Sequence, residues 1–136
     1  MKNVAIKENH LYNKTFRKGK RFLGNCVAVY VLRDYAAERL CRENPQKTVV
    51  NRLGLSVTKK VGGAVERNRA KRIIRAAYSE LSPRIQKGNL IVIAARENIA
   101  GKKSTDVLKE LSYGFKKLGM MDNGYHSEKK EITEKN

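Results

Sequence analysis

Arginine and lysine side chains are crowded into one stretch of the sequence, residues 59–75 (KKVGGAVERNRAKRIIR). This stretch holds seven basic residues and a single acidic residue. A guanidinium group grips phosphate through two parallel hydrogen bonds and also stacks on bases. The pattern therefore favours the binding of a polyanion through its phosphate groups, and a nucleic acid fits this description.

The same stretch predicts an amphipathic helix over residues 64–81. An apolar stripe recurs at helical spacing and consists of Ala70, Ile73, Ile74, Ala77 and Leu81. The opposite arc carries Asn68, Arg69, Lys71, Arg72 and Arg75, and Arg67 lies nearer its boundary. Small and β-branched residues in the stripe favour packing on a sheet over insertion into a membrane surface, which would call for Leu, Phe or Trp. Gly62-Gly63 predicts a tight turn before the helix, whose first amides would be free to meet a phosphate.

Three aromatic residues form a second candidate site. Tyr12 and Phe16 are four residues apart in a predicted helix and so share one face, and Tyr30 lies in a predicted strand. Exposed aromatic rings beside basic residues are the usual platform for unpaired bases. The same rings also suit an ordinary apolar core, and the sequence leaves both readings open.

Residues for protein-side catalysis are sparse. His10 and His126 lie in flanking segments, and Asp34 and Asp106 have no partner at metal-ligand spacing. Two cysteines and two histidines are too few for a zinc site or a disulfide framework, so we expect Cys26 to be a buried strand thiol. We therefore assign no catalytic residue and no metal ligand to the protein.

The chain has 136 residues and a formal net charge of +17, with 40% hydrophobic residues. Residues 1–118 hold 27 basic and nine acidic residues, whereas residues 119–136 have few apolar residues and a net charge of −1. We predict one folded domain over 1–118 and a disordered tail over 119–136. Because no apolar run approaches the roughly 20 residues of a membrane span and no signal peptide is recognisable, we expect a soluble, cytoplasmic protein.

Periodicity predicts six main elements in an α+β domain. They are a helix over 8–18, strands over 25–32 and 48–58, the helix over 64–81, a strand over 89–95 and a helix over 104–118, with a basic turn over 18–21. The order α-β-β-α-β-α is typical of an α/β sandwich with helices packed on a small sheet.

The run Gly54–Tyr78 (GLSVTKKVGGAVERNRAKRIIRAAY) closely resembles the signature of the bacterial ribonuclease P protein component. That family carries a G-L-S-V-S-K-K strand followed by an R-N-R-x-K-R-x-I-R helix. The likeness extends to Tyr12-x-x-x-Phe16-x-x-Gly19, to the strand that contains Tyr30 and to Leu90–Arg96, and so covers about residues 8–118.

The resemblance implies a fold and a function. The fold would be an α/β sandwich of the ribosomal-protein domain 2-like type, which domain IV of elongation factor G also has. It would include a left-handed βαβ crossover, which departs from the general preference for right-handed crossovers. The protein would act as a monomer, one copy per RNA, in an endoribonuclease that removes the 5′ leader of precursor tRNA. The catalytic RNA would perform the hydrolysis with Mg²⁺ that it mainly binds itself, and no membrane would be involved.

The resemblance also assigns site residues. Tyr12, Phe16 and Tyr30 would stack on leader bases, while Ser56, Lys60 and Arg96 would contact leader phosphates. The catalytic RNA would be bound by Arg67, Asn68, Arg69, Lys71, Arg72 and Arg75. Two alternatives stay open: a structural ribosomal or general RNA-binding protein without a catalytic assembly, and a DNA-binding regulator. The second is disfavoured because no partner helix of a helix-turn-helix precedes the basic helix.

Overall fold

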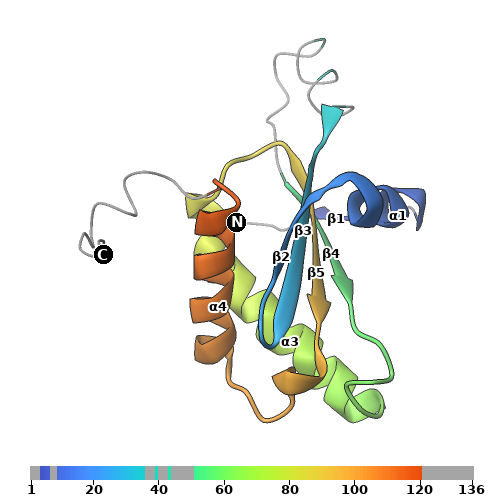
Figure 1. Ribbon diagram of the computed structural model, residues 1–136, viewed down its shortest axis with the longest axis vertical. Coiled ribbons are helices and arrows are strands. Elements are labelled where there is room, and N and C mark those ends of the chain that lie inside the picture. The colour runs from blue at the N-terminus through green and yellow to red at the C-terminus, as the bar shows by residue number, and fades with distance from the viewer. Residues whose placement is uncertain (1–3, 7–8, 36–38, 40–42, 44–50, 121–136) are drawn as a thin grey trace, which may run out of the picture.

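The computed structural model describes residues 4–6, 9–35, 39, 43 and 51–120. Its elements are β1 (Val4–Ala5), α1 (Asn9–Lys18), β2 (Lys20–Leu23), β3 (Val27–Arg33), β4 (Arg52–Ser56), α3 (Ala64–Leu81), β5 (Asn89–Ala95) and α4 (Ser104–Lys117). Two short 3₁₀ turns, η1 (Ser82–Arg84) and η2 (Glu97–Ile99), follow α3 and β5 (Figure 1).

One five-stranded sheet organises the domain, in the order β1-β4-β5-β3-β2. The central strand β5 is parallel to β4 and antiparallel to β3, while β1 runs parallel to β4 and β2 antiparallel to β3. Because β5 is covered on both faces, its sequence NLIVIAA is nearly all apolar. The parallel neighbours β4 and β5 are joined through α3, which is the βαβ unit that the resemblance implies.

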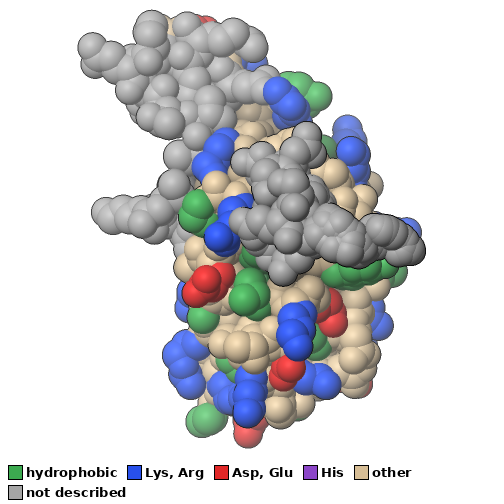
Figure 2. Space-filling view, turned by 90° about the vertical axis from the view of Figure 1, so that its left-hand side faces the viewer, with side chains coloured by type: hydrophobic (Ala, Val, Ile, Leu, Met, Phe, Trp, Pro, Cys, Tyr) green, Lys and Arg blue, Asp and Glu red, His purple; other side chains and the backbone are tan. Residues whose placement is uncertain are grey.

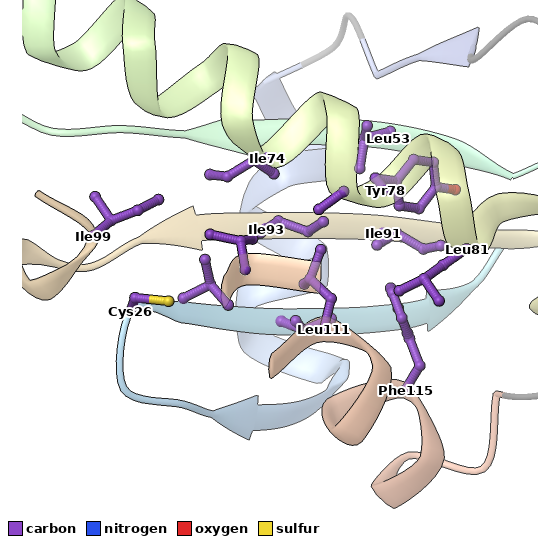
Figure 3. Packing of buried hydrophobic residues seen from close by; sticks show 14 of the residues in the cluster. Cys26, Leu53, Ile74, Tyr78, Leu81, Ile91, Ile93, Ile99, Leu111 and Phe115 are labelled. Atoms are coloured by element: carbon purple, nitrogen blue, oxygen red, sulfur yellow. The ribbon is translucent and has the colours of Figure 1, made fainter. Parts of the chain in front are cut away.

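Helices cover both faces of the sheet (Figure 1). Strand residues alternate between the faces: Val27, Val29 and Val31 of β3 belong to the cluster built with α3 and α4, whereas Tyr30 packs with α1. We call these two sides the α3/α4 face and the α1 face. The larger core lies on the α3/α4 face, where Ile74 and Tyr78 of α3 meet Leu111 and Phe115 of α4 above the central strands (Figure 3).

The α+β class and the predicted succession of elements are confirmed. The helix over 64–81 and the strand over 89–95 have the predicted bounds. The basic turn over 18–21 was a wrong prediction, because β2 begins at Lys20 and pairs with β3. The short strand β1 was also missed. The first predicted strand begins at Val27 instead of residue 25, and of the second only Arg52–Ser56 is strand, with residues 48–50 outside the described part.

The folded domain continues past the predicted boundary at residue 118. Met120 is buried, its N–H donates to the Phe115 carbonyl at 2.8 Å, and its own carbonyl accepts from the Gln86 N–H at 2.8 Å. The first bond closes the C-terminal end of α4, and the second connects it to the segment that leads into β5. Residues 121–136 lie outside the described residues, so the disorder of the tail stays a prediction.

Glu110 of α4 fixes the hairpin between β2 and β3. Its carboxylate Oε2 accepts the backbone N–H groups of Cys26 at 2.9 Å and of Val27 at 2.8 Å. Cys26 is buried as expected, but it lies in the turn directly before β3 and not in the strand itself. Burial and the neighbouring Glu110 carboxylate both disfavour the thiolate and raise the pKa of Cys26 to about 11. The hairpin that carries Tyr30 is thus tied to the opposite helical layer.

Candidate nucleic-acid interface

Helix α1 brings two of the three aromatic residues onto the sheet. Its apolar side packs against a small buried cluster of Ile6, Leu90 and Val92. Tyr12 lies over Gly54 of β4, where a Cβ atom would be 2.6 Å from the tyrosine ring. Glycine at this position is therefore what lets the ring approach the strand so closely.

Phe16 and Tyr30 complete the group. Their ring centroids are 4.8 Å apart and the ring planes meet at 77°, an edge-to-face pair. Tyr12, Phe16 and Tyr30 are all half-buried, so each ring packs on the small cluster and keeps part of its surface accessible. The structure thus brings the three predicted residues together on one face. We call this set the aromatic surface.

Small side chains continue the α1 face beside the aromatic surface. Tyr30 of β3 lies opposite Val92 of β5, which lies opposite Gly54 of β4. Two residues along each strand, the next row on the same face is Ala28, Ala94 and Ser56. Ser56, predicted to contact phosphate, is half-buried at the end of β4. Ala28 is buried and Ala94 is half-buried, so no large side chain of this row projects from the sheet beside the aromatic rings.

Lys60 follows the end of β4 by four residues, and Arg96 directly follows β5. Both line one cavity of about 370 Å³, together with Thr58, Ala95, Glu97 and Asn98. Both side chains are exposed, so their charges face solvent. Thr58 and Asn98 were not singled out from the sequence, since nothing in the spacing of such common polar residues marks them. We call the cavity that these six residues line the end cavity.

The turn before α3 has the conformation that Gly62-Gly63 predicts. Gly62 has φ +147°, a region that side-chain-bearing residues rarely adopt, and its N–H donates to the Lys59 carbonyl at 3.1 Å. Gly63 then serves as the N-cap of α3. This turn connects the end cavity directly to the first turn of the basic helix.

Helix α3 buries its predicted stripe through Ala70, Ile74, Ala77 and Leu81, while Ile73 is partly buried. Asn68, Arg72 and Arg75 are exposed, and Lys71 is half-buried. We call these four residues the basic face.

The other two predicted arginines are already engaged within the protein. Arg69 is half-buried and its guanidinium donates to the Lys102 carbonyl at 2.7 Å. Arg67 is half-buried and its Nε donates to the Gly63 carbonyl at 3.4 Å. Arg69 therefore supports the loop before α4 as well as adding charge, a role that the helical wheel did not distinguish.

The side of the molecule that carries α4 differs from the basic face. In Figure 2, Lys and Arg side chains on this side lie among Asp, Glu and hydrophobic side chains. Within the described ranges, no helix is long and apolar enough to cross a membrane. The same residues contain no group of three or more His, Cys, Asp or Glu side chains that could hold a metal ion.

The class of protein that this arrangement defines is an α+β domain with two surfaces suited to nucleic acid. The aromatic surface lies on the α1 face of the sheet, and the basic face lies on the outer side of α3, which covers the other face. The end cavity and the turn after it lie between them.

Comparison with known proteins agrees with this architecture. The family model for ribonuclease P matches residues 1–119. The ribonuclease P protein component of Clostridium acetobutylicum is 34% identical over 121 residues, covering 89% of this chain and 93% of the relative. That of Bacillus cereus strain G9842 is 39% identical over 119 residues, covering 88% and 94%.

Solved structures show the same fold. The RNase P protein of Staphylococcus aureus superposes with a TM-score of 0.71 at 25% identity, covering 89% of this chain and 100% of the other. The RNase P protein of Thermotoga maritima has a TM-score of 0.62 at 21% identity, covering 83% and 94%. This chain belongs to the ribonuclease P protein family, and the resemblance read from residues 54–78 is confirmed.

Proposed function

We propose that this chain holds the single-stranded 5′ leader of precursor tRNA on its aromatic surface while α3 docks on the catalytic RNA of ribonuclease P. The holoenzyme would cleave the precursor endonucleolytically and release the mature tRNA 5′ end. The observation that carries the proposal is the set of half-buried rings, Tyr12, Phe16 and Tyr30, gathered on one face of the sheet.

The aromatic surface supports binding of an unpaired strand for a physical reason. A ring that is packed on one side and accessible on the other is already held in place, so a base that stacks on it costs little further ordering of the protein. The small row of Ala28, Ala94 and Ser56 offers space for the next nucleotide. Lys60 and Arg96 at the end cavity then supply positive charge for its phosphates.

The basic face supports a different kind of contact. Arg72 and Arg75 are exposed on a rigid helix that the core holds in place through Ile74 and Ala77. Such side chains suit the sugar–phosphate backbone of a large folded RNA, where affinity grows with the number of phosphates neutralised. One protein per RNA, acting in the cytoplasm, is the simplest assembly.

The catalytic step would belong to the RNA. Magnesium favours carboxylate and phosphate oxygens, and three of the described acidic side chains are already engaged within the protein. Glu110 accepts two backbone amides, Asp34 is 2.9 Å from Arg52, and Asp106 accepts the Lys103 N–H at 3.0 Å. These residues do not fit a resident metal of the protein. Metal ions held by the RNA would activate water and stabilise the displaced oxygen.

Reconstitution tests the proposal. The full-length protein is combined with a bacterial ribonuclease P RNA at low magnesium, and 5′-leader cleavage of precursor tRNA is measured against the RNA alone. We expect faster cleavage and tighter binding of precursor than of mature tRNA, because only the precursor carries a leader.

An equally basic protein of similar size and unrelated fold serves as the control, since it reproduces the charge without the aromatic surface. Cleavage no faster than with this control would overturn the proposal. It would instead favour a structural ribosomal or general RNA-binding role without a catalytic assembly.

A further inference from the structure

The edge strand β2 places two side chains on the same face as the aromatic surface. In its pairing with β3, Arg21 lies opposite Tyr30 and Leu23 lies opposite Ala28. Because Tyr30 belongs to the α1 face, strand alternation puts Arg21 and Leu23 there as well. Phe22, between them, packs on the α3/α4 side against the larger core.

Both side chains reach solvent. Arg21 is exposed, and Leu23 is 57% exposed although it is a large hydrophobic residue. An exposed apolar residue on an edge strand normally carries a risk of association with other chains. Here the next residue inward is the buried Ala28, in the row of small side chains, so Leu23 adds accessible apolar surface at the edge of the sheet.

The spacing links β2 to the aromatic surface. Opposed residues of antiparallel strands have Cβ atoms about 5 Å apart, so the Arg21 side chain is long enough to reach the accessible side of the Tyr30 ring. From Gly54 on β4 to Arg21 on β2, one row of residues crosses three strand spacings, or about 14 Å. A strand that stacks on Phe16 and Tyr30 and continues outward would meet β2 next.

We infer that β2 is an outer segment of the binding track for single-stranded RNA, with Arg21 contacting a backbone phosphate and Leu23 the apolar side of a base or ribose. This inference rests on the proposed function, because the strand it binds is the 5′ leader. It adds two leader-contacting residues from a segment whose sequence suggests only a basic turn.

Neighbouring residues on β2 provide a matched test. Arg21→Ala and Lys20→Ala each remove one positive charge from adjacent positions, but Lys20 lies opposite Val31 and so points to the α3/α4 face. In the reconstituted holoenzyme, the affinity for precursors with leaders of increasing length is measured and divided by the affinity for mature tRNA. We expect Arg21→Ala to lower this ratio about fivefold for long leaders and to leave the shortest leaders unaffected. Lys20→Ala should leave the ratio unchanged at every length.

Two further variants separate charge from packing. Arg21→Lys keeps a cation and should restore most of the ratio. Leu23→Ser should lower the ratio for long leaders without changing its salt dependence, since no charge is lost. Both positions are exposed, so thermal unfolding of each variant should match that of the unaltered protein.

The outcomes distinguish the two proposals. If the unaltered protein prefers leader-bearing precursor but Arg21→Ala and Lys20→Ala behave alike, β2 is not part of the track and the inference is wrong. The same holds if Arg21→Ala weakens short and long leaders equally. If the unaltered protein shows no preference for leader-bearing precursor, the proposed function fails and the role of β2 fails with it.

Discussion

The aromatic surface and the basic face are built in opposite ways. Tyr12, Phe16 and Tyr30 come from a helix and a strand, and the position of Tyr12 also depends on Gly54 of a third element. The basic face comes from a single helix, and helical spacing alone puts its four residues on one side: Asn68, Lys71, Arg72 and Arg75. One surface is made by tertiary structure and the other by local periodicity.

This difference determines how each surface would respond to change. A packed aromatic set is specific to the shape of an unpaired base and fails when one ring moves. A row of cations on a helix acts nearly additively, since each contact with a phosphate contributes on its own. We therefore expect sharp, substrate-dependent losses from the first surface and graded, substrate-independent losses from the second.

The largest effect is expected for Glu110→Ala, which disturbs the support of the aromatic surface. The two backbone N–H groups of Cys26 and Val27 would lose their acceptor, so the free energy of unfolding should fall by roughly 2–4 kcal/mol. Denaturant unfolding of the full chain measures it. Glu80→Ala, which removes an exposed carboxylate from α3, is the control. An equal loss in the free energy of unfolding for the two variants would show that the Glu110 hydrogen bonds do not stabilise the hairpin.

Phe16→Ala should separate the two surfaces most clearly. Removing the ring that pairs with Tyr30 should weaken holoenzyme binding of leader-bearing precursor by about 1–3 kcal/mol and leave mature tRNA unaffected. Equilibrium binding with both substrates gives the comparison. An equal loss of affinity for both substrates would show that Phe16 supports the structure of the protein and does not contact the leader.

Arg72→Ala should have a smaller effect and one that does not depend on the leader. We expect assembly with the catalytic RNA to weaken by about 1 kcal/mol, with a salt slope shallower by about one. Arg69→Ala is the informative partner, because the Arg69 guanidinium bonds to the Lys102 carbonyl. It should lower thermal stability, which Arg72→Ala should leave unchanged. An unaltered salt slope for Arg72→Ala would mean that this arginine is only solvated.

An effect that is absent at neutral pH concerns Cys26, which lies directly before β3 and belongs to neither surface. Its pKa is raised from 9.0 to about 11 in the folded protein, so the neutral thiol stabilises the fold below about pH 9 and this contribution is lost as the pH rises towards 11. The stability difference between the unaltered protein and Cys26→Ala should therefore shrink over that window, as followed by denaturant unfolding. A constant difference would contradict the raised pKa.

The sequence predicted the basic face well and the support of the aromatic surface poorly. The stripe of α3 has a period that one helix alone determines, so its bounds and its buried residues could be read directly. For Tyr12 and Phe16, helical spacing predicted only that the two rings share one side of the helix. Whether the rings were core or platform depended on Gly54 and Tyr30, which lie far away in the chain.

Short strands at the edges of the sheet were also not predicted from the sequence. Lys20–Leu23 has only four residues, two of them charged, and its strand conformation comes from pairing with β3 and from packing of Phe22 on the core. The link from Glu110 to the hairpin spans more than 80 residues and has no local signal. Helical periodicity placed Arg69 on the outer arc of the helix and the resemblance assigned it to the RNA-binding set, but its bond to the Lys102 carbonyl depends on a loop that periodicity does not predict.

Gly54 has a consequence for mutational tolerance. Every replacement of glycine adds a Cβ atom, and at this position that atom would lie 2.6 Å from the far end of the Tyr12 side chain. The ring can swing away, so the chain should still fold and accumulate. A survey of variants scored by protein abundance should thus rate the position as permissive, while the same variants scored by growth that depends on tRNA maturation should rate it as intolerant.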